Sequence, residues 1–284
     1  MRRDGGERGG RLGLSFSSNH GMAKTPDLKK HRANEWRLRD LLHQQEDKRG
    51  FLVAFEGPDG SGKTTQRRLF KKWLETESRE AVSVKWAFSP LVKPLIKARK
   101  GARALSPEEH CLLYAADFRH QLEQVILPAL WSGKMVIADG YLFTGLARAG
   151  ARGLALNWIL NCYEPLFWPD VAFYFDVSPE VSGQRIASTR APKFYDAGQD
   201  VTNIEDPYES YRHYMTRMRQ EYRALASIFQ MITVDAELSI YEQHRSIRQT
   251  FRQTTRRSWA EWNIDAMLEW LDRQERATEV QVAF

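Results

Sequence analysis

The sequence predicts an α/β fold in which helices cover both faces of a parallel β-sheet. Short, continuous apolar runs, typical of parallel strands that are buried on both faces, recur along the chain. Segments with strong helix-start signals stand between these runs. Strands and helices that alternate over roughly 200 residues imply βαβ crossovers, because a parallel strand pair needs a long connection, usually a helix.

Five apolar runs are the predicted strands: 51–56 (FLVAFE), 82–88, 135–139 (MVIAD), 171–177 (VAFYFDV) and 231–235 (MITVD). A helix is predicted over 64–76, directly after a glycine-rich turn. A second begins at Pro107 with Ser106 as its N-cap and continues to about residue 127, where Pro128 is expected to kink it. A third, 179–190, begins behind Ser178 by the same capping pattern.

Composition and charge bound the other parts of the chain. The 284 residues are 42% apolar and 27% charged, which suits one globular domain with extensions. We expect a disordered basic tail (1–32), a helical linker (33–49), the α/β domain (50–253) and a helical extension (254–284). The extension is rich in tryptophan, and it either packs on the domain or binds a partner.

The positive charge is confined to the tail and linker. Residues 1–49 hold 12 Lys/Arg and 7 Asp/Glu, a net +5, whereas the chain as a whole has a net charge of +6. The domain is therefore almost neutral, and a groove for nucleic acid is not expected. No apolar run approaches the roughly 20 residues of a membrane span. Two distant cysteines, Cys111 and Cys162, favour neither disulfides nor zinc, and they indicate the cytoplasm.

The turn after the first predicted strand matches G-x-x-x-x-G-K-[ST], the P-loop pattern. Glycines let consecutive backbone amides point inward, and the start of the next helix adds its positive dipole end. We expect Lys63 to reach the β- and γ-phosphates of ATP, and the Thr64 hydroxyl to bind Mg²⁺. The motif predicts the three-layer P-loop NTPase fold. The expected nucleotide-binding residues are Gly57, Pro58, Asp59, Gly60, Ser61, Gly62, Lys63, Thr64 and Thr65.

Charged residues after two later strands are further candidates. Asp139 ends a predicted strand at the carboxyl edge of the sheet, where it could bind Mg²⁺ through water or polarise the attacking oxygen. Arg185 is a candidate nucleotide-binding residue, and Arg190 and Lys193 are candidate catalytic cations of a mobile lid over 191–207. Solvated cations near a helix end are the alternative for each of these three.

Four stretches of the sequence resemble the thymidylate kinase family, within the nucleoside monophosphate kinases. They are FEGPDGSGKTTQ (55–66), LLYAADFRHQLEQVILPAL (112–130), VIADGY (136–141) and PDVAFYFDVSPEVSGQRI (169–186). Family members show E-G-x-D-G-x-G-K-T-T-Q, F-A-A-D-R, D-R-Y and P-D-x-x-x-x-L-D-V at these places. The resemblance implies that Asp59 binds the acceptor's sugar hydroxyl and that Tyr114 stacks on its base. Tyr141 is a further substrate-binding candidate.

Three positions depart from the family pattern. Family members hold the acceptor's phosphate with arginines where this chain has Phe88, Phe118 and Gly140. Losing a charge-assisted hydrogen bond typically costs about 1.5–3 kcal/mol, so something must compensate. Arg119 and Lys93 are the expected replacements. The ATP half of the site therefore looks intact, and the acceptor half, in which Phe88 and Phe118 remain lining candidates, looks altered.

The resemblance implies transfer of the γ-phosphoryl group of ATP, with Mg²⁺, to a deoxynucleoside monophosphate, above all dTMP. One alternative is a P-loop kinase that acts on a nucleoside or a modified metabolite. Another is a nucleotide-binding regulator with little catalysis, whose tail and C-terminal helix engage a partner. A homodimer is also expected, because family members are commonly dimers.

Overall fold

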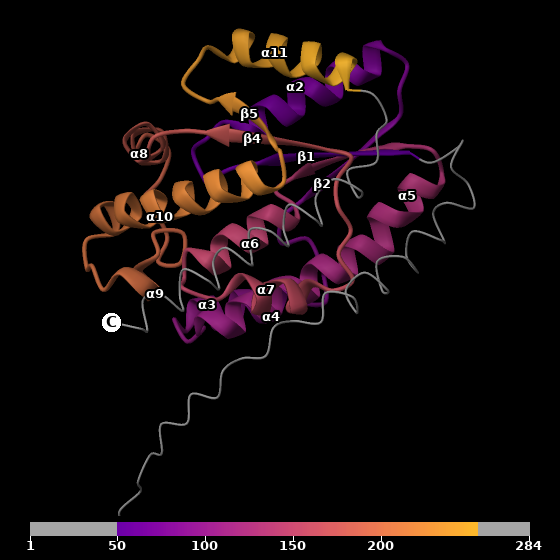
Figure 1. The fold of residues 1–284 in the computed structure, drawn as a ribbon. Helices are drawn as coiled ribbons and strands as arrows, with labels where there is room; N and C mark the ends of the chain where they lie inside the picture. The colour runs from indigo at the N-terminus through magenta and orange to yellow at the C-terminus, as the bar shows by residue number, and fades with distance from the viewer. Residues whose placement is uncertain (1–49, 255–284) are drawn as a thin grey trace, which may run out of the picture.

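The computed structural model describes residues 50–254, and these form three layers with the sheet in the middle (Figure 1). The predicted tail (1–32), the linker (33–49) and nearly all of the C-terminal extension lie outside the described residues. No helix in the described part is both long and apolar enough to cross a bilayer. The predicted α/β fold of the P-loop NTPase type is confirmed.

The sheet has five parallel strands in the order β2-β3-β1-β4-β5. They are β1 (Phe51–Glu56), β2 (Ala81–Lys85), β3 (Met135–Asp139), β4 (Val171–Asp176) and β5 (Ile232–Asp235). In β1, β3 and β4 nearly every residue is buried, which explains why these strands appear in the sequence as unbroken apolar runs. Phe55 pairs with Asp139 across β1 and β3, so the ends of these strands lie side by side.

The second strand is shorter than predicted. It ends at Lys85 instead of residue 88, and Ala87 has a φ of 59°, which no strand residue adopts. The carboxylate of Asp117 accepts the amides of Phe88 at 3.1 Å and Ser89 at 2.6 Å. A side chain from a helix therefore takes the hydrogen bonds that a longer strand would make.

Alternate strand residues face two separate apolar clusters. On β1, Leu52 and Ala54 belong to one cluster, and Val53 and Phe55 belong to the other. This alternation follows from the period of two that every β-strand has. Helices must therefore cover both faces of the sheet.

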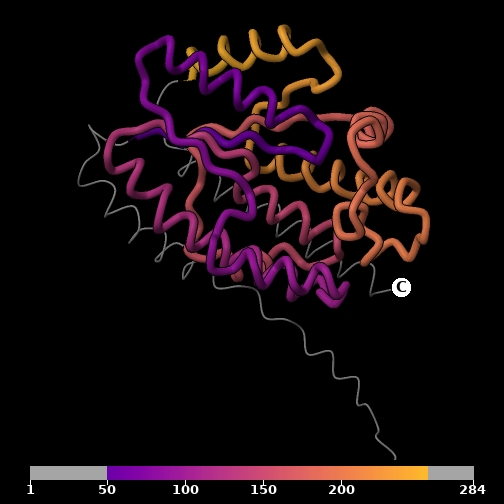
Figure 2. Tube along the Cα trace, turned by 180° about the vertical axis from the view of Figure 1, so that it is seen from behind, coloured from indigo at the N-terminus to yellow at the C-terminus, as the bar shows by residue number. Residues whose placement is uncertain are grey.

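Two helices cover one face. α2 (Lys63–Thr76) and α11 (Ile240–Gln253) lie side by side there, as Figures 1 and 2 both show. Phe70 and Trp73 of α2 pack with Phe251 of α11 at ring-centroid distances of 5.1 and 5.9 Å. A capping box at Ser239 and Glu242 begins α11.

The other face carries a larger set of helices (Figure 1). It includes α4 (Pro107–Gln121), the π-helical turn η2 (Leu122–Ile126), α5 (Leu127–Trp131), α6 (Leu142–Gly150), α7 (Leu156–Tyr163) and α10 (Pro207–Ile228). Ser106 caps α4 through the amide of Glu109, as predicted. The predicted kink at Pro128 takes the form of a widened π turn just before it, because proline cannot donate to the preceding turn.

Three short helices complete the described chain. α3 (Lys93–Gly101) follows β2, and α8 (Pro179–Ala187) follows β4 with Ser178 as its N-cap. α9 (Gln199–Thr202) interrupts the predicted lid. Figure 1 places α8, α9 and the start of α10 near the carboxyl ends of the strands, which is the edge where open α/β sheets bind ligands.

Candidate functional site

The glycine-rich turn joins β1 to α2 at the carboxyl edge of the sheet. Gly57, Gly60 and Gly62 have φ values of 143°, 78° and 86°, a region that other residues rarely enter. A Cβ atom on Gly60 would also lie 2.7 Å from the carbonyl oxygen of Ser182 on α8. Glycine is therefore required at this position both for its conformation and for the close approach of α8.

Side chains occupy four successive carbonyl groups of this loop. The carbonyl of Gly57 accepts a hydrogen bond from Tyr222 at 3.3 Å, and that of Pro58 accepts one from Lys63 at 3.1 Å. The carbonyl of Asp59 accepts one from Tyr211 at 2.9 Å, and that of Gly60 accepts one from Arg185 at 3.2 Å. Two of the donors come from α10, which lies far from the loop in sequence. These bonds fix the peptide planes, and so they fix the direction in which the amides point.

The amides of the loop remain available. Within residues 50–254, five backbone N–H groups of the loop donate no hydrogen bond to a carbonyl group or a side chain: those of residues 59, 60, 62, 63 and 64. The hydroxyl of Ser61 is buried and also has no hydrogen-bond partner in this range. A run of free amides at a helix N-terminus forms an anion-binding nest. The residues present therefore fit a polyphosphate.

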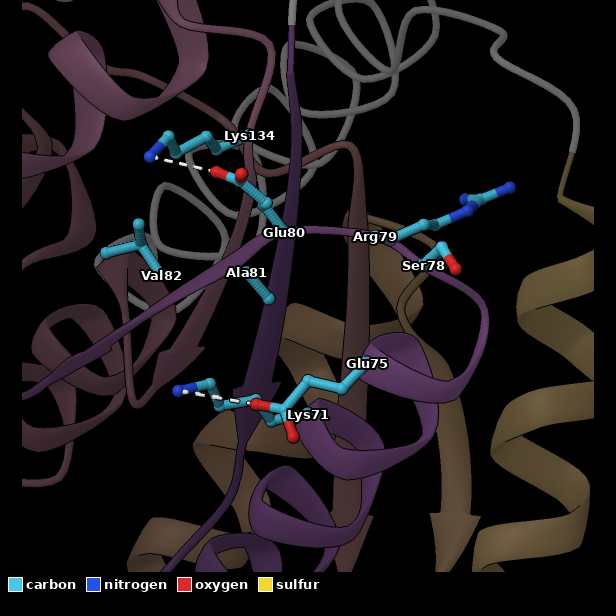
Figure 3. A pocket seen from close by; sticks show the side chains of 8 residues that line it. All are labelled: Lys71, Glu75, Ser78, Arg79, Glu80, Ala81, Val82 and Lys134. Carbon is cyan, nitrogen blue, oxygen red and sulfur yellow. Dashed lines mark ion pairs between the residues drawn. The ribbon is translucent and has the colours of Figure 1, made fainter.

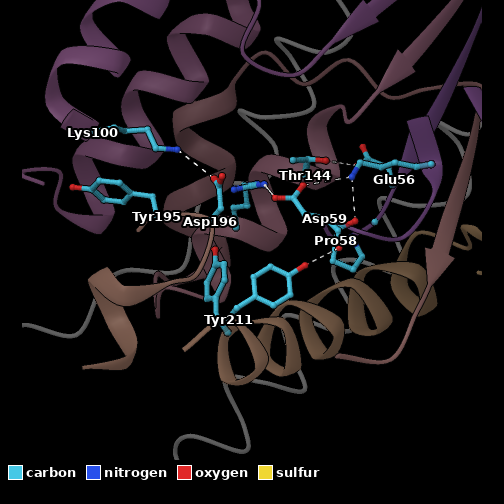
Figure 4. A network of polar contacts seen from close by, with 12 residues as sticks. Glu56, Pro58, Asp59, Lys100, Thr144, Tyr195, Asp196 and Tyr211 are labelled. Carbon is cyan, nitrogen blue, oxygen red and sulfur yellow. Dashed lines mark hydrogen bonds and ion pairs between the residues drawn. The ribbon is translucent and has the colours of Figure 1, made fainter. Parts of the chain in front are cut away.

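A partly buried carboxylate lies among cations beside this nest (Figure 4). Asp59 is 3.8 Å from Nζ of Lys63 and 3.2 Å from Nη2 of Arg148 on α6. Burial alone would raise the pKa of Asp59, but Arg148, Lys63 and Arg190 outweigh it and hold the pKa at about 2. Asp59 is therefore ionised at neutral pH, and Lys63 is folded back onto its own loop.

The segment predicted to be a lid contacts the same cluster. Asp196 lies 3.5 Å from Lys100 on α3 and 3.6 Å from Arg190 (Figure 4). The hydroxyl of Tyr195 is buried and accepts the amide of Leu105 at 2.8 Å. In this conformation the segment is docked on the domain, with acidic and basic side chains facing one another.

Asp139, at the end of β3, is 8% exposed and forms an ion pair with Arg67 of α2 at 3.3 Å. Its register partner Phe55 lies two residues before the loop, so this carboxylate stands next to the nest. Within the described range, no group of three or more His, Cys, Asp or Glu side chains could hold a metal. Mg²⁺ is commonly held by one or two protein oxygens, water and substrate phosphates, so its binding needs no such group. Thr64 and Asp139 supply oxygen donors of this type.

Glu56, the last residue of β1, is fully buried below the loop. It accepts the amide of Tyr141 at 2.9 Å and the hydroxyl of Thr144 at 2.6 Å. Burial raises the pKa of Glu56 to about 7, although both hydrogen bonds and Lys63 oppose that shift. This carboxyl group connects the first residues after β3 to the base of the glycine-rich loop.

Aromatic side chains with unsatisfied polar atoms line the other side of the site. Trp86 stacks on Tyr114 of α4 at 5.4 Å with an interplanar angle of 13°, and His110 lies 4.5 Å from the same tyrosine ring. Three of the buried polar atoms here have no hydrogen-bond partner among residues 50–254: Nε1 of Trp86, Nε2 of His110 and the hydroxyl of Tyr163. Such an arrangement suits a flat, polar-edged group such as a base.

A separate pocket opens near the start of β2 (Figure 3). It is lined by Lys71, Glu75, Ser78, Arg79, Glu80, Ala81, Val82 and Lys134. Lys71 pairs with Glu75 at 3.8 Å, and Lys134 pairs with Glu80 at 3.0 Å. It lies at the amino edge of the sheet, away from the nest, and most of its charges neutralise one another. We assign it no part in the chemistry.

Comparison with known proteins places these features in a family. The family model for thymidylate kinase matches residues 55–247, which is more than half of the chain. The chain belongs to the thymidylate kinase family. A probable thymidylate kinase 2 from Saccharolobus solfataricus is 34% identical over 202 residues, 70% of this chain and 94% of that protein. A probable thymidylate kinase from Pyrococcus abyssi is 35% identical over 209 residues, with the same coverage.

A bacterial relative extends the likeness. The thymidylate kinase of Clostridium novyi is 32% identical over 147 residues, which is 49% of this chain and 71% of that protein. This thymidylate kinase family member is therefore an enzyme of the nucleoside monophosphate kinase class, as the sequence predicted.

In this thymidylate kinase family member, the three positions without arginine have different surroundings. Phe88 is 43% exposed, whereas Phe118 is buried against Tyr141 and Tyr163 at 5.1 and 5.5 Å. Gly140 has a φ of 76°, and a Cβ there would lie 3.0 Å from the hydroxyl of Thr144. None of these three positions supplies a cation.

The expected replacement cations are not placed at the centre of the site. Arg119 is half-exposed and pairs with Glu123 of the same helix at 2.5 Å. Lys93 is exposed at the start of α3. Neither side chain contacts Asp59, Lys63 or the loop, so the structure gives no support to a compensating role for them.

The other predicted residues have distinct placements in this kinase. Arg185 donates to the carbonyls of Gly60 and Ala236, so it braces the loop. Arg190 is half-exposed and reaches Asp196, whereas Lys193 is exposed. Tyr141 is buried, and its hydroxyl donates to the carbonyl of Phe167 at 2.9 Å. Their roles in binding and catalysis remain predictions.

Sequence analysis missed five residues that lie at the centre of the site: Glu56, Arg67, Trp86, Arg148 and Tyr211. Arg67 and Glu56 adjoin the P-loop motif, and a charged residue so close to that motif was a usable signal. No helix was predicted over 142–150 or 207–228, so Arg148 and Tyr211 had no structural context from which a role could be inferred.

Proposed function

We propose that this enzyme transfers the γ-phosphoryl group of ATP to dTMP and forms dTDP. The observation that supports this most directly is the run of free loop amides beside Lys63, because it fits the phosphate groups of a nucleotide. The relatives in Saccharolobus solfataricus and Pyrococcus abyssi bear the name thymidylate kinase, which favours dTMP as the acceptor.

On the nucleotide side, residues Gly57 to Thr65 hold the phosphates of ATP through backbone amides, and Lys63 leaves its own loop to bind the β- and γ-phosphates. Thr64 and Asp139 are the oxygen donors for Mg²⁺, which when bound neutralises charge on the transferring group. Arg185 holds the loop in shape. Arg190, just before the docked lid, and Lys193, on the lid, supply positive charge to the transition state.

On the acceptor side, Asp59 accepts a hydroxyl group of the sugar, because its low pKa keeps it ionised. Tyr114, already stacked on Trp86, provides the aromatic surface for the base. Tyr141 and Phe118 support that surface from below, and Phe88 borders it from the exposed side. Arg119 is the least supported of the predicted acceptor residues.

A coupled assay of ADP release tests the proposal, with ATP, Mg²⁺ and a panel of nucleoside monophosphates and nucleosides. We expect turnover with dTMP above the others. No turnover with dTMP at millimolar concentration would remove this substrate assignment. The Lys63→Ala variant is the control: it should keep its fold and lose turnover by about a hundredfold or more, because one donor to a developing charge contributes that much.

A second candidate is a kinase for an uncharged acceptor. It is favoured by Phe88, Phe118 and Gly140, which place no cation where the family pattern has three. Thermal-shift measurements separate the two functions. Stabilisation by thymidine but not by dTMP would favour the second. Turnover with either acceptor would exclude a regulator that only binds nucleotide.

We place the reaction in the cytoplasm, where the free thiols of Cys111 and Cys162 would stay reduced. A homodimer stays a prediction from the family resemblance.

A further inference from the structure

We propose that Arg67 and Arg148 hold the phosphate of the acceptor nucleotide, in place of the side chains that Phe88, Phe118 and Gly140 cannot provide. The proposal rests on the proposed function, since it presumes an acceptor that carries a phosphate. It comes from the arrangement of cations around the nest and from the hydrogen bonds that these two arginines do not make.

Arg67 lies on α2, four residues after Lys63 and therefore on the same face of the helix. Its side chain is 7% exposed, and its ion pair is with Asp139. Although Nε lies 3.3 Å from that carboxylate, the geometry is not that of a hydrogen bond, and Nε has no hydrogen-bond partner in the described part of the chain. A buried guanidinium with an unused donor is unfavourable unless something binds it.

Arg148 lies on α6 and has the same property. Its side chain is 13% exposed, and Nη2 donates to Asp59 at 3.2 Å. Its Nε is buried and, among the described residues, has no partner. Arg148 therefore reaches into the site between the loop and the aromatic side, with part of its hydrogen-bonding capacity free.

Gly140 connects the two arginines in space. It directly follows Asp139, the partner of Arg67, and its Cβ position lies 3.0 Å from the hydroxyl of Thr144. Thr144 is one helical turn before Arg148 on α6. The nearest atoms to that Cβ position belong to Thr144 and Trp86. Gly140 therefore lies beside the turn that carries Arg148 and directly after the carboxylate that pairs with Arg67.

The local charge balance favours an anion. Three cations, Lys63, Arg67 and Arg148, face two carboxylates, Asp59 and Asp139. The nearby carboxyl group of Glu56 has a pKa of about 7 and so carries only part of a negative charge at neutral pH. A phosphate monoester carries close to two negative charges at neutral pH. Guanidinium groups bind such anions through two parallel hydrogen bonds, which gives both affinity and orientation.

Neighbouring arginines are already occupied. Arg152 is buried and donates to Asp200, to Tyr214, and to the carbonyls of Tyr195 and Arg148. Arg185 is bound to the carbonyls of Gly60 and Ala236. Arg67 and Arg148 are the two arginines beside the nest whose Nε groups are buried and unpaired within residues 50–254.

The test compares a ligand with a phosphate to the same ligand without one. The dissociation constants of dTMP and thymidine are measured by calorimetry for the full chain and for Arg67→Met and Arg148→Met. We expect the preference for dTMP over thymidine to fall by about tenfold to a hundredfold in each variant, because each loses charge-assisted hydrogen bonds to the phosphate. Thymidine affinity should stay the same.

Matched controls come from exposed arginines. Arg68→Met on α2 and Arg212→Met on α10 should leave the preference unchanged. If Arg67→Met and Arg148→Met weaken both ligands equally, the arginines only support the fold and the proposal is wrong. Loss of the preference in the control variants would also overturn it.

Removal of either arginine leaves a carboxylate with less neutralisation, so a methionine variant can fail to fold. The variants Arg67→Lys and Arg148→Lys keep the positive charge, and they are measured in place of any methionine variant that does not fold. Lysine is a point charge without the two-pronged geometry, so we expect the preference to fall by at least about threefold. An unchanged preference in both lysine variants would overturn the proposal.

The outcome is separable from that of the proposed function. If the unmodified chain binds thymidine and dTMP equally, this inference fails even if thymidine is phosphorylated. If the chain phosphorylates dTMP but the variants keep the preference, the proposed function stands and this inference fails.

Discussion

Glu56 shows how a single buried carboxyl group connects fold and site. It receives hydrogen bonds from Tyr141 and Thr144, so it fixes the chain directly after β3. Its pKa is about 7 in the folded protein and 4.5 as a free side chain. The folded state therefore binds the proton more tightly, and ionisation of Glu56 destabilises it as the pH rises from 4.5 to 7.

The Glu56→Gln variant removes this buried charge. Relative to the unmodified chain, the variant should gain stability as the pH rises from 4.5 to 7, by roughly 3 kcal/mol if the whole shift is released. Urea unfolding at pH 5 and pH 7.5 measures the difference. Other groups that titrate in this range cancel in the comparison. A stability difference that is the same at both pH values would contradict the raised pKa.

Gly140 illustrates a residue that is constrained by the backbone. With a φ of 76° and a Cβ position 3.0 Å from Thr144 and 3.3 Å from Trp86, the Gly140→Ala variant should lose about 1–2 kcal/mol of stability. Gly101→Ala at the end of α3 is the control, because no atom lies within 4 Å of that Cβ position. The Gly101→Ala variant should unfold at the same denaturant concentration as the unmodified chain, or at a slightly higher one. Equal effects at both glycines would argue against backbone strain at residue 140.

At the scale of elements, α10 has a role that its distance in sequence conceals. Two of its tyrosines, Tyr211 and Tyr222, donate to carbonyls of the glycine-rich loop, so the helix holds the loop in its binding shape. Asp206 begins the helix by accepting the amides of Tyr208 and Glu209. The phosphate-binding loop is therefore stabilised from outside, by an element more than 140 residues away.

The Tyr211→Phe variant tests this support. Loss of one hydrogen bond of about 0.5–1.5 kcal/mol should weaken ADP binding by about twofold to tenfold, since the loop then orders itself on binding. Isothermal calorimetry measures the affinity. Tyr208→Phe on the same helix is the control, because Tyr208 is 47% exposed and its side chain donates no hydrogen bond within the described range. Unchanged ADP affinity in Tyr211→Phe would mean that the loop holds its shape alone.

At the scale of the whole molecule, both faces of the sheet are covered by helices from residues 50–254. The two apolar clusters lie on opposite faces and share no residue, and each is completed by helices that follow or precede the strands in the chain. A parallel sheet needs such cover on both faces, because its strands are apolar on both sides. The described residues therefore meet the requirements of a self-sufficient domain.

We accordingly expect a chain trimmed to residues 50–254 to fold by itself. It should unfold in one cooperative thermal transition and bind ADP with the affinity of the full chain. Differential scanning calorimetry and binding calorimetry check the two halves of this prediction. A broad transition or a tenfold weaker affinity would show that residues 1–49 or 255–284 contribute contacts that the domain needs.

Much of the fold could be predicted from the sequence, because local signals and tertiary structure agree there. The runs at β1, β3 and β4 are apolar on both faces, and Ser106 and Ser178 cap the helices that they precede. The predicted end of β2 was wrong because the carboxylate of Asp117 on α4 accepts hydrogen bonds from the amides of Phe88 and Ser89. No helix was predicted over 207–228, because tyrosines and methionines among many charges hide its apolar face.

The sequence by itself determined the position of the glycine-rich loop, since the P-loop motif is one continuous segment whose shape depends on local backbone geometry. Tertiary structure alone decided which cations lie beside the glycine-rich loop. Arg67 and Arg148 lie on different helices and meet the site only because β1 and β3 are neighbours and α6 follows β3 back across the sheet. Electrostatic interactions depend on distance in space, and spacing along the chain does not report that distance.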